Sequence, residues 1–115
     1  MRHKRKINKF GKTKSHRKML FRNLLRGLFL HKKIKVSRAR ARLLKSQADA
    51  VITLAIKGDL ASRRRVIALF NDAALAKQIF AQAETYKTRS GGYTRIIGAG
   101  FRAGDGCEMV LIQLV

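Results

Sequence analysis

Residues 89 to 102 read Arg89-Ser90-Gly91-Gly92-Tyr93-Thr94-Arg95-Ile96-Ile97-Gly98-Ala99-Gly100-Phe101-Arg102. The first seven positions combine two basic residues, two hydroxyl residues, two glycines and an aromatic ring, and the positions after them are mostly apolar. Glycines allow positive φ angles and leave the backbone open to a bulky partner. The alternating residues from Tyr93 to Phe101 indicate a β-strand. The stretch therefore predicts a loop that leads into a strand of a sheet.

The loop at the start of this stretch carries side chains suited to a nucleic acid. Planar guanidinium groups match a phosphate or a base edge, and the ring of Tyr93 offers a face for base stacking. The alternative is a glycine turn that only begins a hairpin. Of the two tyrosines beside the loop, Tyr86 and Tyr93, one is expected to pack beneath it and the other to be exposed. The candidate binding residues are Arg89, Ser90, Gly91, Gly92, Tyr93, Thr94 and Arg95.

The charge of the whole chain favours the nucleic-acid interpretation. The sequence has 27 lysines and arginines against six acidic residues, a formal net charge of +21 over 115 residues. A folded body with this charge repels itself unless a polyanion neutralises it. Nucleic acid is the first candidate partner and an anionic membrane surface is the second. With 46% hydrophobic residues, most of the chain is expected to fold, as one domain.

Cysteine content and hydrophobic runs exclude several classes of protein. Cys107 is the only cysteine, which excludes an intramolecular disulfide and a thiolate metal cluster and fits a reducing, intracellular compartment. No apolar run approaches the ~18 residues of a membrane-spanning helix. The basic N-terminus lacks the apolar segment and cleavage site of a secretory signal, and it lacks the serine density of a transit peptide.

Residues 1–14 form a basic arm, and apart from the initial methionine its only apolar residues are Ile7 and Phe10. Eighteen of the 27 basic residues precede Asp49, the first acidic residue. Such a segment cannot build a core, so we expect it to be disordered alone and to order between phosphates on binding. The alternative is a solvated tail or a targeting signal. The candidate binding residues of the arm are Arg2, His3, Lys4, Arg5, Lys6, Lys9, Lys12 and Lys14.

A helix is expected from an N-cap at Ser15 to about His31. One side is apolar at i, i+4 spacing, and a basic stripe lies opposite it, so one side should pack and the other should meet an anion. A membrane-surface helix would show the same pattern. The predicted inward residues are Leu20, Leu24 and Leu28, widened by Phe21, Leu25 and Phe29. His16 and Arg17 at its start and Arg22 in its basic stripe are candidate phosphate contacts, and Asn23 lies on the same side, where a solvated residue is the alternative.

Turn and capping residues predict the remaining elements. They are a strand at 33–36, a helix capped by Ser37 and ended at Gly58, a third helix capped by Asp59, and a fourth from Asn71 or Asp72 to about Tyr86. Two strands joined near residues 104–106 close the chain, and the last, from Cys107 to Val115, is expected to be buried on both faces. The fold class is therefore α+β: about four helices packed on a small three-stranded sheet, with residues 1–14 as an extended basic arm and 15–115 as a single globular domain.

Two of these helices carry runs of arginine. The helix after Ser37 begins with Arg38 and Arg40, where positive charge opposes the helix macrodipole. This placement is favourable where a phosphate lies, so both residues are candidate binding residues. In the third helix, at least one residue of the triplet 63–65 is expected to lie along the surface or to pair with Asp59 or Asp72.

Residues with catalytic or cofactor chemistry are sparse. Positions 98–103 match the G-x-G-x-x-A dinucleotide fingerprint, but a turn and a strand follow where that site needs a helix N-terminus. The three histidines have no metal-ligand spacing, and the six acidic residues form no pair suited to general acid–base catalysis. No enzyme, cofactor, metal site or small-molecule substrate is predicted.

Short motifs recur along the whole chain in the order typical of one known family. They are Met1-Arg2-His3, His16-Arg17, Phe21-Arg22-Asn23, Ile52-Thr53-Leu54-Ala55, Asp59-Leu60-Ala61-Ser62-Arg63-Arg64, Gly91-Gly92-Tyr93-Thr94-Arg95-Ile96 and Gly100-Phe101-Arg102-Ala103-Gly104-Asp105. With these motifs the sequence resembles the bacterial-type large-subunit ribosomal protein seventeen family.

The resemblance implies a non-catalytic structural protein of the large ribosomal subunit, in a bacterial cytoplasm or an organelle. It implies binding to large-subunit ribosomal RNA near the outlet of the nascent-peptide tunnel and contact with neighbouring ribosomal proteins. Residues 1–14, His16, Arg17, Arg22 and Asn23 would lie against RNA. Arg89 to Arg95 and Arg102 would form a second RNA contact.

A DNA-compacting protein and a membrane-active cationic peptide are the rival classes. The first needs dimerisation and wedge residues for the minor groove, and the sequence suggests neither a dimer stripe nor an exposed apolar tip, so no homo-oligomer is expected. The folded C-terminal half disfavours the second. The predicted mechanism is phosphate neutralisation with counterion release, together with shape recognition.

Overall fold

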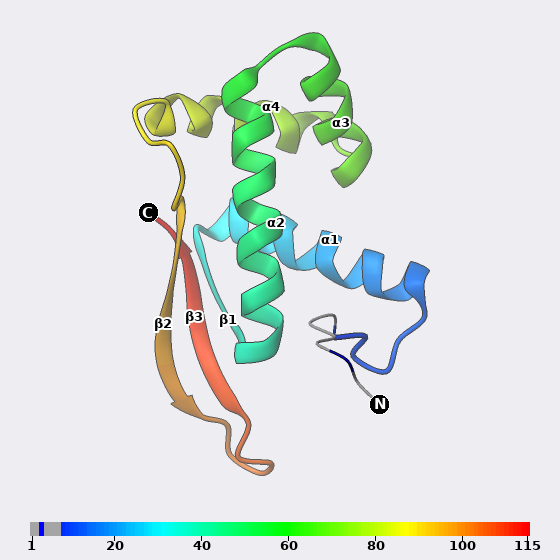
Figure 1. The fold of residues 1–115 in the computed structure, drawn as a ribbon, viewed down its shortest axis with the longest axis vertical. Coiled ribbons are helices and arrows are strands. Elements are labelled where there is room, and N and C mark those ends of the chain that lie inside the picture. Colours follow the sequence, from blue (N-terminus) through cyan, green and yellow to red (C-terminus); the bar gives the residue numbers. More distant parts are fainter. Residues whose placement is uncertain (1–2, 4–7) are drawn as a thin grey trace.

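Eight elements follow one another along the chain in the computed structural model, which describes His3 and residues 8–115 (Figure 1). They are α1 (Lys14–His31), β1 (Lys33–Ser37), α2 (Arg38–Lys57), α3 (Leu60–Phe70), α4 (Ala73–Ala83), the 3-10 turn η1 (Glu84–Tyr86), β2 (Thr94–Phe101) and β3 (Glu108–Leu114). The α+β class is confirmed: within the described residues, four α-helices accompany a three-stranded antiparallel sheet. Residues 1–2 and 4–7 of the predicted arm lie outside the described residues.

Short polar side chains cap three of the four described helices, whereas Ser37 occupies the predicted N-cap position of α2 without a side-chain cap hydrogen bond. The side chains of Asp59 and Asp72 accept hydrogen bonds from the backbone N–H groups of Ser62 and Leu75 at 2.7 and 3.1 Å, as predicted. The predicted cap at Ser15 is wrong. Thr13, in an extended conformation, caps α1 by accepting from the His16 N–H at 3.4 Å. Lys14 and Ser15 therefore lie in the first turn of the helix, so the last residue of the predicted arm belongs to α1.

The sheet has the order β1-β3-β2, with β3 in the centre. The register sets Ile34, Ile112 and Ile96 side by side in one row, and Lys35, Leu111 and Ile97 in the next. Because side chains alternate between the two faces of a sheet, the first row faces the helices and the second faces away. Val110 and Ile112 are buried on the helix side.

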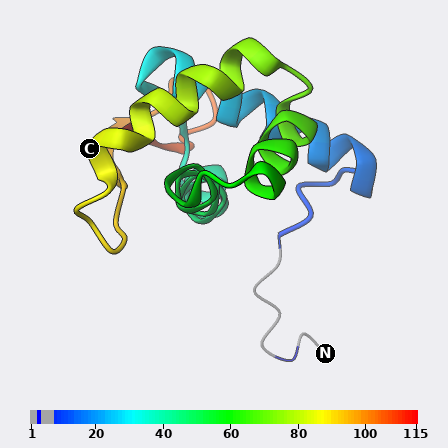
Figure 2. The same ribbon diagram turned by 90° about the horizontal axis from the view of Figure 1, so that it is seen from above.

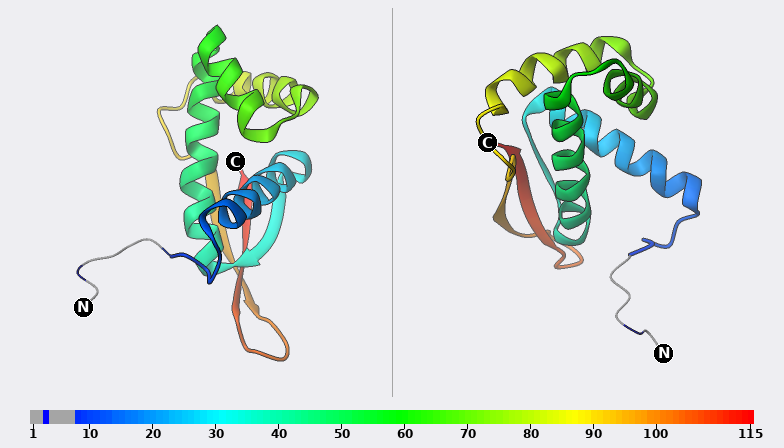
Figure 3. Two further views of the ribbon diagram at one scale, coloured as in Figure 1. Left: turned by 90° about the vertical axis from the view of Figure 1, so that its right-hand side faces the viewer. Right: turned by 45° about the horizontal axis from the view of Figure 1, so that its top comes forward.

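Only one face of the sheet is covered. Both α1 and α2 pack against the side that carries Val36 and Ile112, and Figure 3 shows the helices on that side alone. The prediction that the last strand is buried on both faces is wrong, since Met109, Leu111 and Gln113 are only half-buried. A near-continuous apolar strand therefore has one half-exposed side here. We call the uncovered side the open face; it consists of Lys33, Lys35, Arg95, Ile97, Met109, Leu111 and Gln113.

The core lies between the covered face of the sheet and the helices. When the molecule is viewed along the axis of α2, the helices α3 and α4 lie beside α2 (Figure 2). The buried side of α2 consists of Leu44, Ala48, Val51, Ile52 and Ala55, which recur at helical spacing. The stripe of α1 is rotated from its prediction: Leu20 and Leu24 are half-buried. The fully enclosed side chains of α1 are Phe21, Leu25, Leu28 and Phe29.

Several charged side chains on the surface of the helices make ion pairs or a cation–π contact. Of the two arrangements expected for the arginine triplet, an ion pair is not found among the described residues, whereas Arg63 lies along the surface, with its guanidinium carbon 5.2 Å from the centroid of the Phe80 ring. Asp72 pairs with Arg26 at 3.6 Å and Asp59 with Lys57 at 3.7 Å. None of the described helices combines the length and the apolar character needed to cross a membrane.

Candidate nucleic-acid interface

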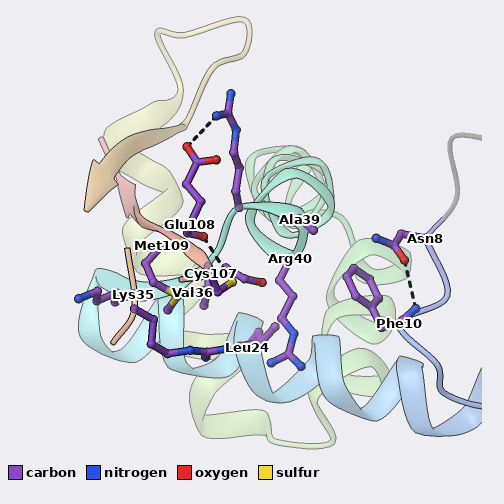
Figure 4. Close-up of a pocket in the computed structure, with 13 residues that line it drawn as sticks. Asn8, Phe10, Leu24, Lys35, Val36, Ala39, Arg40, Cys107, Glu108 and Met109 are labelled. Carbon is purple, nitrogen blue, oxygen red and sulfur yellow. Dashed lines mark hydrogen bonds and ion pairs between the residues drawn. The ribbon is translucent and has the colours of Figure 1, made fainter. Parts of the chain in front are cut away.

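A cavity of about 630 Å³ opens between the segment before α1, the start of α2 and the base of the β2–β3 hairpin. Its walls carry Phe10 and Leu24 on one side and Val36 and Met109 on another (Figure 4). We call it the basic cavity, because four of its lining residues are cations and one is an acid. These five are Lys35, Arg38, Arg40, Arg102 and Glu108.

The cations of the basic cavity differ in how far they are neutralised. Arg38 donates from Nη1 to Oε1 of Glu108 at 2.7 Å. Lys35 and Arg40 have no carboxylate partner in the described part of the chain. Arg40 extends from the first turn of α2 across the cavity toward α1 (Figure 4). Its position at the start of α2 is where an anion is favoured by the helix dipole and by unpaired backbone N–H groups. The cavity thus has the charge and donors to hold phosphate.

The predicted residues Arg38 and Arg40 therefore meet in one place with residues that the sequence analysis did not single out. Lys35 reaches the cavity because β1 runs directly into α2. Asn8 and Phe10 reach it because the Phe10 ring packs on the Phe21 ring of α1, with centroids 5.7 Å apart. The alternation Lys33-Ile34-Lys35-Val36 was the available signal for Lys35, since it places lysine on the side opposite the core.

The loop between η1 and β2 leaves its backbone open, as predicted. Arg89, Ser90, Gly91 and Gly92 are exposed. Gly92 has a φ angle of 66°, which side chains disfavour, and a Cβ added at either glycine would meet no atom within 4 Å. The space above the two glycines is therefore free for a partner to approach the backbone.

Tyr93 has a different role from the one predicted. Its ring is 4% exposed and packs edge-on against Tyr86, with centroids 5.5 Å apart. Its hydroxyl donates to the backbone O of Arg89 at 3.2 Å. Tyr86 is 7% exposed, and burial raises the pKa of its hydroxyl. The expectation of one exposed stacking tyrosine is wrong: both rings form the floor of the loop and hold its shape.

Thr94 also turns inward. It is 4% exposed, and its hydroxyl donates to Oδ1 of Asp49 on α2 at 3.2 Å. Strand β2 begins at Thr94, so its exposed side starts at Arg95 rather than at Tyr93. The predicted alternation from Tyr93 is therefore wrong in its first member, because Tyr93 precedes the strand.

The predicted residues near the start of α1 remain on the surface or half-buried. His3, Lys9, Lys14, His16 and Asn23 are exposed. Lys12 and Arg17 are half-buried, and Nη1 of Arg17 donates to the backbone O of Lys12 at 3.1 Å. Arg22 lines a second, mostly apolar cavity of about 250 Å³ between α1 and α2. Arg2, Lys4, Arg5 and Lys6 lie outside the described residues.

The resemblance implied that Arg102 forms one RNA contact together with Arg89 to Arg95, but in the structure Arg102 lies away from that loop. The two lie at opposite ends of β2, which has eight residues and so spans roughly 25 Å; Figure 1 shows the loop and the hairpin turn at opposite ends of the sheet. Arg102 belongs instead to the hairpin end and the basic cavity. The expectation of no exposed apolar tip is also wrong, because Phe101 beside this turn is 77% exposed.

An ion pair fixes the hairpin turn. Arg102 donates from Nε to Oδ1 of Asp105 at 3.1 Å and from Nη2 to Oδ2 at 2.6 Å, and the Cys107 N–H donates to Oδ1 at 3.1 Å. The hydrogen bonds from Arg102, followed by the one from Cys107, lower the pKa of Asp105 to about 2.

We expect this turn to loosen only in strong acid. The folded pKa of Asp105 lies below the unfolded value of about 3.9, so the stabilisation by the pair is present above that value and is lost as the pH falls through about 2. The amide signal of Cys107, followed by NMR, should titrate with a midpoint near pH 2. Arg102→Gln should move the midpoint up toward 3.9; an unchanged midpoint would show that the pair does not set the pKa.

Comparison with known proteins shows which family this chain resembles. A family model described as "Ribosomal protein L17" matches residues 20–115. The chain is 45% identical to the large ribosomal subunit protein bL17 of Moorella thermoacetica over 108 residues, covering 93% of this chain and 96% of that protein. It is 40% identical to bL17 of Desulforapulum autotrophicum over 116 positions, covering 100% and 97%. It is 44% identical to bL17 of Desulfosudis oleivorans over 116 residues, and this match covers 100% of this chain and 56% of that protein.

The family model covers the loop, the hairpin and the lining of the basic cavity from Leu24 onward, and the relatives are bacterial. A protein of this family works in translation, within cytoplasmic ribosomes, as a structural component and not as an enzyme. The chain therefore belongs to the ribosomal protein L17 family.

Proposed function

We propose that this chain, as a structural constituent of the large ribosomal subunit, binds and stabilises large-subunit ribosomal RNA by neutralising phosphates and by recognising RNA shape. The family resemblance supports a position near the outlet of the peptide exit tunnel. Its partners are that RNA and neighbouring ribosomal proteins, and it acts as a single copy.

The distribution of unpaired charge is the observation that carries this proposal. Of the 23 lysines and arginines in the described residues, five form ion pairs and 18 have no carboxylate within 4 Å. The acids are already occupied: five of them make these ion pairs, and Asp49 accepts from Thr94. The folded body thus keeps a large excess of cations, which favours binding to an external polyanion.

Two surfaces would divide the RNA contacts. The first joins the arm, the start of α1 and the basic cavity, with His16, Arg17, Arg22, Asn23, Arg38 and Arg40. The second joins the loop to the open face, with exposed backbone at Gly91 and Gly92 and side chains at Arg89, Ser90 and Arg95. Tyr93 and Thr94 would serve the second surface indirectly, by holding the loop. If about ten phosphates are neutralised, log affinity should fall against log salt with a slope near −7 to −9.

The basic cavity provides a direct test on two residues. We expect Lys35→Gln with Arg40→Gln to lower the affinity for protein-free large-subunit ribosomal RNA about tenfold at physiological salt and to make the salt slope shallower by about 1.5 units. Each of these cations lacks a carboxylate partner, so its replacement breaks no ion pair. Affinity is measured by filter binding over a series of salt concentrations, with duplex DNA as competitor.

Arg64→Gln with Arg65→Gln is the matched control. Both arginines are exposed on α3, lack carboxylate partners and belong to neither proposed surface. The control pair should change the affinity less than twofold. Equal losses for both pairs, or equal affinity for RNA and duplex DNA, would indicate a generic polyanion binder and contradict the proposal.

A further inference from the structure

The end of the β2–β3 hairpin differs from the rest of the molecular surface. It projects away from the helices, beyond the start of α2 (Figures 1 and 3). Phe101, at the end of β2, is 77% exposed, the largest exposed fraction among the large hydrophobic residues described. Ile97, on the same strand, is 41% exposed. Aromatic side chains are enriched at protein–protein interfaces, where they fill pockets of the partner.

The hairpin end is held in one conformation. In the register of the sheet, Glu108 of β3 lies opposite Phe101 of β2. The Arg102 N–H donates to the Cys107 O at 2.8 Å, and the Gly106 N–H donates to the Arg102 O at 3.0 Å. The side-chain pair of Arg102 and Asp105 closes the turn. Phe101 is therefore presented by a preorganised element, which reduces the entropy lost on docking.

The charge of the hairpin end disfavours a phosphate backbone. Between residues 98 and 109 there are one basic and two acidic residues, whereas the whole chain carries +21. All three are paired: Arg102 with Asp105 at 2.6 Å and Glu108 with Arg38 at 2.7 Å. No cation of the tip is left for phosphate.

We propose that the hairpin end docks on a protein, inserting the Phe101 ring into an apolar pocket of a neighbouring large-subunit protein. This inference rests on the proposed function only in taking the assembled subunit as the place of docking. Differently charged parts of the molecule then bind different kinds of partner. Unpaired cations face RNA, and the neutral, apolar hairpin end faces protein.

Site-specific photocrosslinking in assembled large subunits tests the division. Phe101 is replaced by the photoreactive aromatic p-benzoylphenylalanine, and in a second sample Arg40 is replaced by the same residue. After irradiation, the adduct at position 101 should resist ribonuclease and be destroyed by protease, with one ribosomal protein as the joined partner. The adduct at position 40 should be with RNA.

The two positions separate the two hypotheses. An RNA adduct at 101, or no adduct at all, would overturn the docking inference while an RNA adduct at 40 still supports the proposed function. A protein adduct at 101 without any RNA adduct at 40 would support docking and contradict the cavity as an RNA contact.

Truncation of the ring provides a second measurement. Phe101→Ala should leave the affinity for protein-free ribosomal RNA unchanged within twofold, yet increase about tenfold the fraction of the chain released from large subunits by a high-salt wash. Leu60→Ala is the matched control, since Leu60 on α3 is 63% exposed and apolar but lies on no proposed surface. A loss of RNA affinity in Phe101→Ala, or equal release in both variants, would overturn the inference.

Discussion

Neutralising the seven lysines and arginines of residues 1–14 is expected to lower the affinity for protein-free large-subunit ribosomal RNA by about three orders of magnitude at physiological salt. If each cation meets one phosphate, the slope of log affinity against log salt becomes shallower by about five to six units, because the corresponding counterions are no longer released. Equilibrium binding across a salt series measures both quantities. The positions changed to glutamine are Arg2, Lys4, Arg5, Lys6, Lys9, Lys12 and Lys14.

Substitution is a better test here than deletion of the segment. Its described end is part of the folded body: Thr13 caps α1, Phe10 packs on Phe21, and Arg17 donates to the Lys12 carbonyl. Deletion would therefore disturb α1 as well as remove charge. The control exchanges lysine and arginine at the same seven positions, which keeps the charge and should keep the salt slope. A neutralised arm with an unchanged slope would show that phosphate contacts lie elsewhere.

Phe29→Ala is expected to lower the free energy of unfolding by about 3 to 5 kcal/mol. Phe29 is 1% exposed and meets the Phe70 ring edge-on, with centroids 6.0 Å apart, so it joins α1 to α3. Its removal leaves a cavity where two helices meet. For a domain of this size the melting temperature should fall by more than about 10 °C. Thermal and denaturant unfolding followed by circular dichroism measure the loss.

The adjacent residue serves as the control. Leu30 lies on the same helix with 50% exposure, so Leu30→Ala should lower the free energy of unfolding by less than about 1 kcal/mol. Similar losses in the two variants would mean that Phe29 does not occupy the enclosed position described. Both variants keep all cations, so RNA affinity should change only where the fold is lost.

Local sequence rules predicted most of the secondary structure because the deciding interactions are local. The carboxylates of Asp59 and Asp72 bond to N–H groups three residues ahead, and Gly58 ends α2 with a φ angle of 65°. The error at Ser15 has the same origin. Thr13 and Ser15 are both good caps, and the choice of Thr13 depends on the path of the preceding segment, which Phe10 fixes by packing on α1.

The candidate site was less predictable, since exposure is a tertiary property. Tyr93 and Tyr86 are seven residues apart, and nothing local indicates that both rings turn inward. Their burial follows from the contact between them and from the pairing of the Val115 N–H with the Tyr93 carbonyl at 3.0 Å. Lys35 and Arg40 line the same cavity because β1 leads directly into α2, a relation visible in the sequence only after both elements are assigned.

The sequence by itself determined the α+β class, most of the helix ends, the excess of positive charge and the family, because composition, capping and motif spacing are properties of neighbouring residues. Tertiary structure alone decided which cations stay unpaired, which face of the sheet remains open, and where the aromatic rings lie. Those outcomes depend on contacts between residues far apart in the chain, such as Arg38 with Glu108 and Thr94 with Asp49. Burial against a distant partner, not residue type, placed Tyr93 inside and left Phe101 in solvent.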